Sequence, residues 1–163
     1  MVSVMINAKS VIRKTFNAKS SISASVVNDF LAILDGASAT SDLSYDVTLV
    51  DHGKFIQMQA NIRVSLELLC QRCGSVFSLP YNADITLKLV DASSIGSSDE
   101  IALSDDDLDT VTYLDNQIDL DHILLESVYL DLDGNCICSE NCKGICTLCG
   151  QNLNLGSCTC VPD

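Results

Sequence analysis

The sequence lacks the residues and runs on which several common functions depend. It has no tryptophan, two prolines, and nine lysine and arginine residues against 22 aspartate and glutamate residues. No run of about 18 apolar residues occurs, so no membrane span is predicted. An apolar signal core with a small-residue cleavage site is also missing, which argues against secretion. The hydrophobic content of 47% is nevertheless high enough for a folded core.

Catalytic motifs are missing as well. The chain has no nucleophile elbow, no glycine-rich phosphate loop and no HExxH motif. His52 and His122 lie at a predicted turn and a predicted helix start, where solvated histidines are more common than ligands or bases. The acidic run at 105–109 lacks the alternate spacing and the glycine of a calcium loop. No catalytic residue and no small-molecule substrate are therefore predicted.

Negative charge is concentrated in the second half of the chain. Residues 1–60 contain five basic and five acidic side chains, whereas residues 99–133 contain twelve acidic and no lysine or arginine side chains. Nucleic-acid binding relies on basic side chains that displace counterions, so direct RNA contact through this half is disfavoured. A basic protein partner fits the charge better. The alternative is a solvated acidic loop that serves only solubility.

The N-terminal region allows two interpretations. Residues 1–28 contain no acidic side chain, and their lysine and arginine residues lie among serines, as in organelle transit peptides. A strand and a turn with solvated lysines is the preferred interpretation. A cytoplasmic location is expected, with organelle targeting as the alternative.

Three segments alternate apolar and polar residues with a period of two, which is typical of half-buried strands. They span residues 43–50, 54–69 and 76–90, and His52-Gly53 forms a turn between the first two. Short connections between consecutive strands predict an antiparallel meander. Pro80 removes one ladder donor from the third segment, so a bulge or a sheet edge is expected there.

Two segments have the spacing of amphipathic helices, and these would cover the apolar face of the sheet. They span residues 23–34 and about 119–129. Residues 91–109 are rich in serine and aspartate and are predicted to be a mobile loop. The predicted fold class is α+β, an antiparallel β-meander covered by helices. Residues 1–133 would form this domain and residues 134–163 a cysteine-rich tail.

The nine cysteines favour metal binding over disulfides, because their number is odd and no secretion signal precedes them. The pattern Cys-x-x-Cys-Gly occurs at Cys70 and again at Cys146, and two sulfurs three positions apart can bind one tetrahedral ion. The glycine after each pair is predicted to let the backbone turn there. The tail is too polar and glycine-rich to form its own core. Structural Zn²⁺ is therefore predicted. The candidate ligands are Cys70, Cys73, Cys138, Cys142, Cys146, Cys149, Cys158 and Cys160.

The spacing leaves the number of sites open. Two sites would group Cys146, Cys149, Cys158 and Cys160 on one ion, and Cys70, Cys73, Cys138 and Cys142 on another. A single site would combine Cys146 and Cys149 with two others from the tail. The alternatives to zinc are an iron–sulfur cluster at the Cys142-x₃-Cys146-x₂-Cys149 spacing, dithiol redox chemistry at Cys70 and Cys73, and unmetallated thiols.

Together these motifs resemble the YceD family, which is named for large ribosomal RNA subunit accumulation. The resemblance covers roughly residues 20–160 and depends on LLCQRCG at 68–74, LLES at 124–127, CSENCKGICTLCGQNLN at 138–154 and the closing CTC. Thr147 departs from the family, which commonly has proline there. The resemblance implies a role in large-subunit rRNA accumulation or processing and in ribosome assembly, through a ribosomal protein or processing factor. It implies no active site. A thiol–disulfide redox protein using Cys70 and Cys73 is the alternative.

Overall fold

A long antiparallel hairpin forms the centre of the fold. The computed structural model describes residues 4–94, 109–132 and 136–160. Within the hairpin, β5 (Ile56–Leu69) pairs along its whole length with β6 (Val76–Asp91), without a break in register. This register places apolar side chains opposite one another on one face, as in the pairs Ile62–Ala83 and Met58–Leu87. The two predicted strands and their antiparallel pairing are confirmed.

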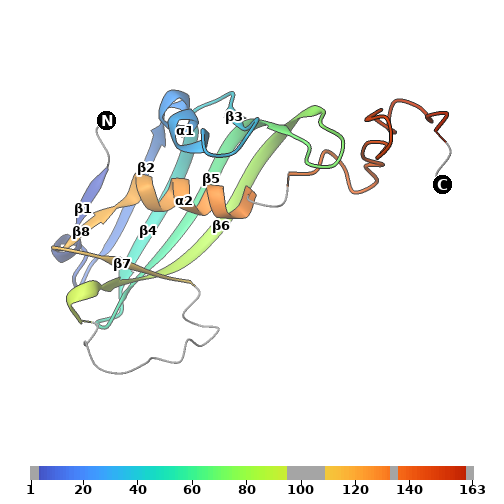
Figure 1. Cartoon of the computed structure of the whole chain (residues 1–163). Coiled ribbons are helices and arrows are strands. Elements are labelled where there is room, and N and C mark those ends of the chain that lie inside the picture. The colour runs from blue at the N-terminus through green and yellow to red at the C-terminus, as the bar shows by residue number, and fades with distance from the viewer. Residues whose placement is uncertain (1–3, 95–108, 133–135, 161–163) are drawn as a thin grey trace, which may run out of the picture.

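The sheet extends on both sides of this hairpin in the order β2-β4-β5-β6-β7 (Figure 1). β4 continues the predicted meander antiparallel to β5, and β2 pairs antiparallel with β4. β7 has no counterpart among the predicted strands, and it pairs with β6 in parallel, so the sheet is mixed rather than wholly antiparallel. The additional strands are β2 (Thr15–Ile22), β3 (Ser38–Ala39), which pairs with β5, β4 (Leu43–Asp51) and β7 (Thr110–Tyr113).

Two helices lie on the apolar face, as predicted. α1 (Ala24–Leu31) is shorter than expected, because Leu34 N–H donates to Leu31 O and the chain then turns through Gly36 at a φ of 74°. α2 (Leu120–Leu132) extends slightly beyond its predicted end. The short strands β1 (Met5–Asn7) and β8 (Gln117–Asp119) form a second sheet. The 3₁₀ helices are Ala8–Ser10 and Ala92–Ser94.

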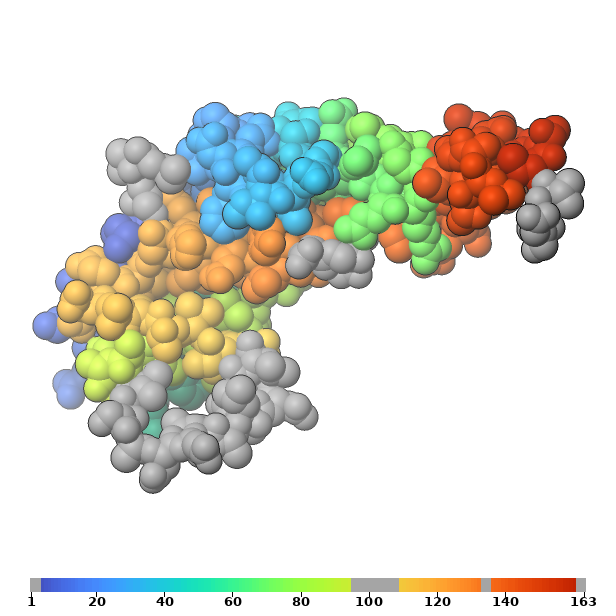
Figure 2. All heavy atoms as spheres, viewed as in Figure 1, coloured from blue at the N-terminus to red at the C-terminus, as the bar shows by residue number. Residues whose placement is uncertain are grey.

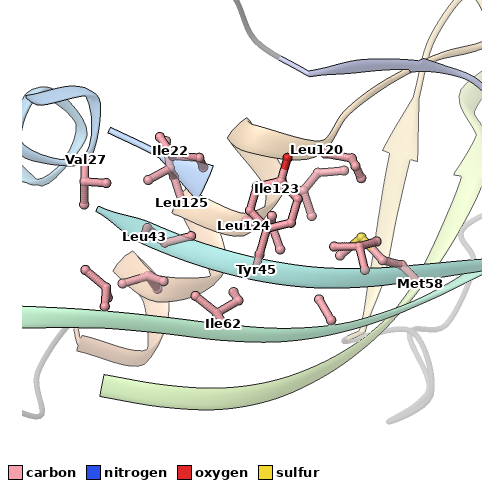
Figure 3. Packing of buried hydrophobic residues seen from close by; sticks show 14 of the residues in the cluster. Ile22, Val27, Leu43, Tyr45, Met58, Ile62, Leu120, Ile123, Leu124 and Leu125 are labelled. Carbon is pink, nitrogen blue, oxygen red and sulfur yellow. The ribbon is translucent and has the colours of Figure 1, made fainter. Parts of the chain in front are cut away.

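The core lies between the sheet and α2. Figure 3 shows Leu124 and Leu120 of α2 directed toward Tyr45 and Met58 on the sheet. Leu124, Leu120 and Met58 are fully buried. The even-numbered residues of β5 from Ile56 to Leu68 are all buried. The alternation of apolar and polar residues therefore determines which face of the strand packs into the core. Burial of this apolar face supplies the main driving force for folding.

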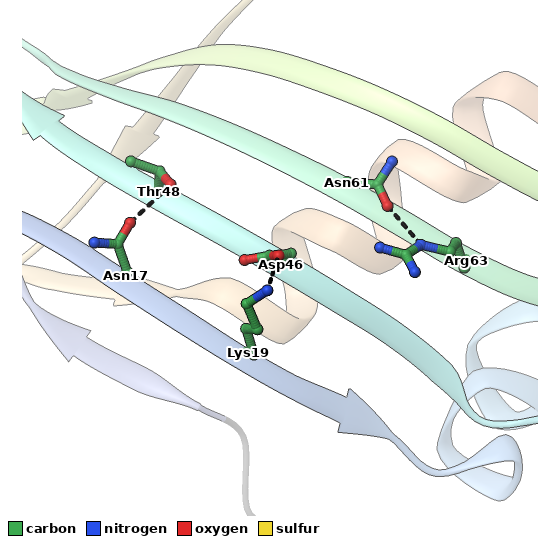
Figure 4. Close-up of polar contacts among 6 residues, drawn as sticks. All are labelled: Asn17, Lys19, Asp46, Thr48, Asn61 and Arg63. Carbon is green, nitrogen blue, oxygen red and sulfur yellow. Dashed lines mark hydrogen bonds and ion pairs between the residues drawn. The ribbon is translucent and has the colours of Figure 1, made fainter.

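The opposite face of the sheet is polar (Figure 4). Side chains on neighbouring strands interact across it: Thr48 Oγ1 donates to Asn17 Oδ1 at 2.9 Å, and Lys19 Nζ lies 2.6 Å from Asp46. Pro80 lies opposite Ser65 in an uninterrupted register, so no bulge forms. Among the described residues, β6 has no neighbour at Pro80 other than β5. The predicted sheet edge at Pro80 is therefore confirmed.

The cysteine-rich tail projects from the end of the molecule that carries the β5–β6 turn (Figures 1 and 2). Within the described residues 136–160, the buried residues are all cysteines: Cys136, Cys142 and Cys146. This described part of the tail thus lacks an apolar core of its own. Most of the predicted mobile loop, residues 95–108, lies outside the described residues. No helix among the described residues is both long and apolar enough to span a membrane.

Candidate metal centres

Eight cysteines gather in two groups of four, and within each group the sulfur atoms all lie within 4.8 Å of one another. The first group, which we call the hairpin tetrad, consists of Cys70, Cys73, Cys138 and Cys142. The second group, the tail tetrad, consists of Cys146, Cys149, Cys158 and Cys160. This division corresponds to the two-site grouping among the alternatives that the spacing left open.

The sulfur spacing of the hairpin tetrad suits a tetrahedral ion. Cys70 Sγ lies 3.8 Å from Cys142 Sγ, and Cys73 Sγ lies 3.8 Å from Cys138 Sγ. Zn–S bonds of about 2.3 Å would place tetrahedral sulfurs about 3.8 Å apart, whereas a disulfide bond measures only about 2.05 Å. All nine cysteines are free thiols. The donor atoms, their number and their spacing therefore fit a four-sulfur metal site.

Both Cys-x-x-Cys-Gly segments adopt the same turn. Gly74 and Gly150 follow the second cysteine with φ angles of 69° and 74°, in the left-handed region that glycine tolerates best. Gly74 N–H donates to Cys70 O at 2.8 Å, and Gly150 N–H donates to Cys146 O at 2.9 Å. The role predicted for these glycines, to let the backbone turn at the cysteine pair, is confirmed.

Backbone N–H groups converge on the hairpin tetrad. Burial raises the pKa of the Cys70 thiol, but the N–H groups of Cys138, Cys73 and Arg72 lower it to about 6. Cys138 N–H donates to Cys70 Sγ at 3.4 Å. The backbone N–H and the hydroxyl of Ser75 lower the pKa of Cys73 in the same way. These donors favour the thiolate, which is the form that binds metal.

Neighbouring thiols oppose one another's ionisation. Hydrogen bonding to Cys142 raises the pKa of Cys138 to about 12, and hydrogen bonding to Cys149 raises the pKa of Cys160 to about 12. In the tail tetrad, backbone N–H groups, chiefly that of Cys149, lower the pKa of Cys146 to about 6. Like charges this close disfavour each other. A cation at the centre of each tetrad would allow all four sulfurs to ionise.

Asn152 ties the tail to the hairpin, and Asn154 contacts the hairpin tetrad from within the tail. Asn152 Nδ2 donates to Ser75 Oγ at 2.8 Å, and Asn154 Nδ2 donates to Cys142 Sγ at 3.4 Å. Asn154 Oδ1 in turn accepts from Lys143 N–H at 2.8 Å. The family resemblance includes both asparagines, but the sequence gives no sign of these contacts, because Ser75 and Cys142 are 77 and 12 residues away along the chain.

The remaining cysteine and the histidines lie elsewhere. Cys136 is 8% exposed, and its thiol donates to Leu132 O at 3.3 Å, outside both tetrads. His52 Nε2 lies 2.9 Å from Gln57 Oε1, and the ring of His122 packs edge-on against Phe30. Neither histidine belongs to a group of potential metal ligands among the described residues. Of the acidic run at 105–109, all but the last residue lies outside the described residues.

Residues 58–163 match the family described as "Large ribosomal RNA subunit accumulation protein YceD". The chain belongs to the YceD family. Both tetrads lie within the matched residues, so the metal candidates are part of the segment that defines membership.

A maize (Zea mays) protein named "Large ribosomal RNA subunit accumulation protein YCED homolog 1, chloroplastic" is 41% identical to this YceD-family chain over 49 residues. The match covers 29% of this chain and 17% of the maize protein, so the chain corresponds to a small part of that relative. No solved structure matches the chain.

Proposed function

We propose that this YceD-family chain supports the accumulation or processing of large-subunit ribosomal RNA, and thereby ribosome assembly, as a non-enzymatic factor. The match of residues 58–163 to a family named for this role is the observation that carries the proposal. The maize relative has the same role in its name. A second part of the proposal concerns the metal: each tetrad holds one structural zinc ion.

Zinc suits the chemistry of both tetrads. Four thiolates in a tetrahedral arrangement are a common ligand set for structural zinc, and a complete sulfur shell leaves no position for a reactive water. Metal binding of this kind contributes folding free energy on the order of 10 kcal/mol. The tail needs such a contribution, because the buried residues in its described part are all cysteines. In the hairpin tetrad, the ion would join the β5–β6 turn to the segment that follows α2.

A basic protein is the proposed partner. The net charge of −13 repels RNA phosphates and attracts cationic surfaces, which accelerates association with a basic protein. Ribosomal proteins and rRNA-processing factors with basic segments have the required charge. The chain would therefore act on ribosomal RNA indirectly, in the cytoplasm or in an organelle.

The redox alternative has one observation in its favour. The lowered pKa of Cys70 is a property that nucleophilic thiols share. However, Cys70 and Cys73 are only 1% and 5% exposed, and their sulfurs contact Cys142 and Cys138. A substrate disulfide would have to reach thiols that are already enclosed. Comparing disulfide reduction by the wild type and by Cys73→Ser tests this alternative, since a structural protein has no activity to lose.

The proposed function is tested in cells that lack the protein. Mature large-subunit rRNA should fall relative to small-subunit rRNA and recover when the wild-type chain is restored. An unchanged ratio would reject the rRNA role. Metal analysis of the purified protein tests the second part. Colourless protein with two zinc ions per chain is expected. Brown protein that contains iron would show that the cysteines bind an iron–sulfur cluster instead of zinc.

A further inference from the structure

The outer edge of β6 extends well beyond the strand that covers it. β5 pairs with β6 from residue 76 to residue 89, whereas β7 pairs with it only from Lys88 to Asp91. Among the described residues, no strand pairs with the outer edge between residues 76 and 87. A free edge of this length is a ready template for another strand.

The direction of the backbone groups along this edge follows from one hydrogen bond. Lys88 N–H donates to Asp109 O at 2.8 Å, toward β7 and away from β5. Backbone groups alternate in direction from one residue to the next, and the β5–β6 register is unbroken, so the other even-numbered residues point outward as well. Pro80, which has no N–H, occupies one of these outward positions. The outward N–H groups of β6 that precede Lys88 belong to Val76, Ser78, Asn82, Asp84 and Thr86.

The apolar face of the sheet is incompletely covered at the same edge. The apolar side chains at the even positions of β5 are buried, whereas most of those that lie opposite them on β6 are only partly buried. The partly buried side chains are Phe77, Leu79, Ala83, Ile85 and Leu87. A further strand beside β6 would bury these side chains and would continue the line that β7 begins.

Acidic side chains beside this edge outnumber the one basic side chain of β6, that of Lys88. Asp84 lies on the polar face of β6 itself. On the other side, α2 lies over β6, because the carboxylate of Asp131 accepts a hydrogen bond from Tyr81. Glu126, one turn earlier on α2, lines the groove between α2 and β7. An incoming strand with basic side chains would therefore be favoured over an acidic one.

We propose that the outer edge of β6 binds an extended, lysine- or arginine-rich segment of a protein partner as an added strand. The inference rests on the proposed function, since it gives the surface on which the basic partner would bind. Main-chain hydrogen bonds to the outward groups would provide affinity, and side chains on alternate positions would provide specificity. Apolar partner side chains would cover Leu79 and Ile85 on the face that α2 covers, while basic ones would lie near Asp84 on the polar face.

Amide hydrogen exchange of the full-length, isotopically labelled protein tests this inference by NMR. In the free protein, the outward amides of Asn82, Asp84 and Thr86 should exchange quickly, while the inward amides of Ala83 and Ile85 should be protected. A peptide of about ten residues with alternating valine and lysine, which matches a typical strand length, should protect the outward amides. The control peptide has glutamate in place of lysine and should give much weaker protection.

Variants at Thr86 and at Asp84 separate the contribution of main-chain pairing from that of charge. Thr86→Pro removes an outward N–H without removing a bond to β5, and it should weaken binding of the lysine peptide by about tenfold. Thr86→Val keeps the N–H and should bind like the wild type. Retained protection of the inward amides shows that Thr86→Pro is folded. If Thr86→Pro does not fold, Asp84→Lys serves as the test instead. It keeps the N–H, reverses one charge, and should also weaken binding of the lysine peptide.

Several results would overturn the inference. Outward amides that are already protected in the free protein would mean that the chain covers this edge itself. A dimer that Thr86→Pro dissociates would identify a second copy as the occupant, and equal binding of both peptides would remove the role of charge. If rRNA falls in cells that lack the protein but the peptide does not protect the outward amides, the strand-binding edge is rejected and the proposed function is kept. Protection of the outward amides by the peptide, without an effect of the protein on rRNA in cells, would keep the strand-binding edge and reject the proposed function.

Discussion

The cysteines of this chain differ in thiol pKa and in their contacts, because the groups around each sulfur differ. Cys70 and Cys73 lie in the turn of a hairpin where backbone N–H groups point at them, so the pKa of each thiol is lowered. Cys136 is close to Cys138 in sequence, but its thiol donates to the backbone carbonyl of Leu132. Sequence spacing alone does not distinguish these environments. Two predictions at this scale follow from the difference.

Cys73→Ser should reduce the zinc content of the purified protein from two ions per chain to one. A serine hydroxyl is a poor zinc ligand compared with a thiolate, and the tail tetrad shares no ligand with the hairpin tetrad. Mass spectrometry of metal content measures this change. Cys136→Ser is the matched control and should keep both ions. Loss of an ion from the control would contradict the assignment of ligands.

Zinc should remain bound at pH 7 and be released only below about pH 6, with loss of order in the tail. The pKa values of Cys70 and Cys146 are lowered to about 6 from the ordinary thiol value. A group whose pKa is lowered by folding stabilises the folded state above its unfolded pKa, and this contribution is lost as the pH falls through the folded value. Bound metal resists protonation further. A chromogenic chelator can follow the release; a midpoint above pH 7 would contradict this prediction.

Among the elements, the β5–β6 hairpin has two roles. Its apolar face supplies much of the core, and its turn supplies half of the hairpin tetrad. The other half follows α2, so the packing of α2 on the sheet positions Cys138 and Cys142 beside the turn. Contacts between the tail and the turn complete this arrangement. In one of these contacts Gly144 lies against the turn, where a Cβ on this residue would be 3.1 Å from Arg72 O.

Gly144→Ala should weaken metal binding by the hairpin tetrad, because the added Cβ would displace the Arg72 carbonyl in the metal-binding turn. The φ of Gly144 is 71°, so alanine would also strain the backbone by about 1 kcal/mol. Gly53→Ala is the control, since its φ is 82° but a Cβ there would meet no atom within 4 Å. Competition with a zinc chelator and denaturant unfolding measure the two effects. Similar metal affinity in both variants would show that the contact with Arg72 is unimportant.

For the molecule as a whole, a body with a large core and a cysteine-rich tail lie end to end (Figure 2). The two tetrads differ in access to solvent. In the hairpin tetrad Cys70 is 1% exposed, whereas in the tail tetrad Cys149 is exposed and Cys158 and Cys160 are partly exposed. The stability of the body should therefore depend little on metal, and that of the tail should depend on it strongly.

Chelation should release the ion of the tail tetrad first and make residues 146–160 sensitive to protease, while the sheet remains folded. Local stability follows buried apolar contacts, which the body has and the tail lacks. Limited proteolysis with mass spectrometry locates the cuts, and circular dichroism reports whether the sheet persists. Early cleavage within β4, β5 or β6 would show that the body, too, depends on metal.

Much of the fold could be predicted because long strands repeat a local pattern. The three predicted strands lie within about two residues of β4, β5 and β6, and both predicted helices exist. The short strands β1 and β8, of three residues each, carry too little pattern to be detected. The parallel pairing of β7 could not be predicted either, because four residues do not specify their neighbour. The division of residues 1–133 from residues 134–163 stays a prediction, although the hairpin tetrad draws two cysteines from each side.

The sequence by itself determined the period-two strands, the eight candidate ligands, the glycines that turn after each cysteine pair, and the acidic charge that favours a basic partner. Each of these depends on residues that are close along the chain or on composition. Only the tertiary structure decided which sulfurs share a centre, that Asn152 joins the tail to the hairpin, and that the outer edge of β6 stays open among the described residues. The physical reason is that Cys70 and Cys142 are 72 residues apart in sequence and meet only after α2 has packed on the sheet.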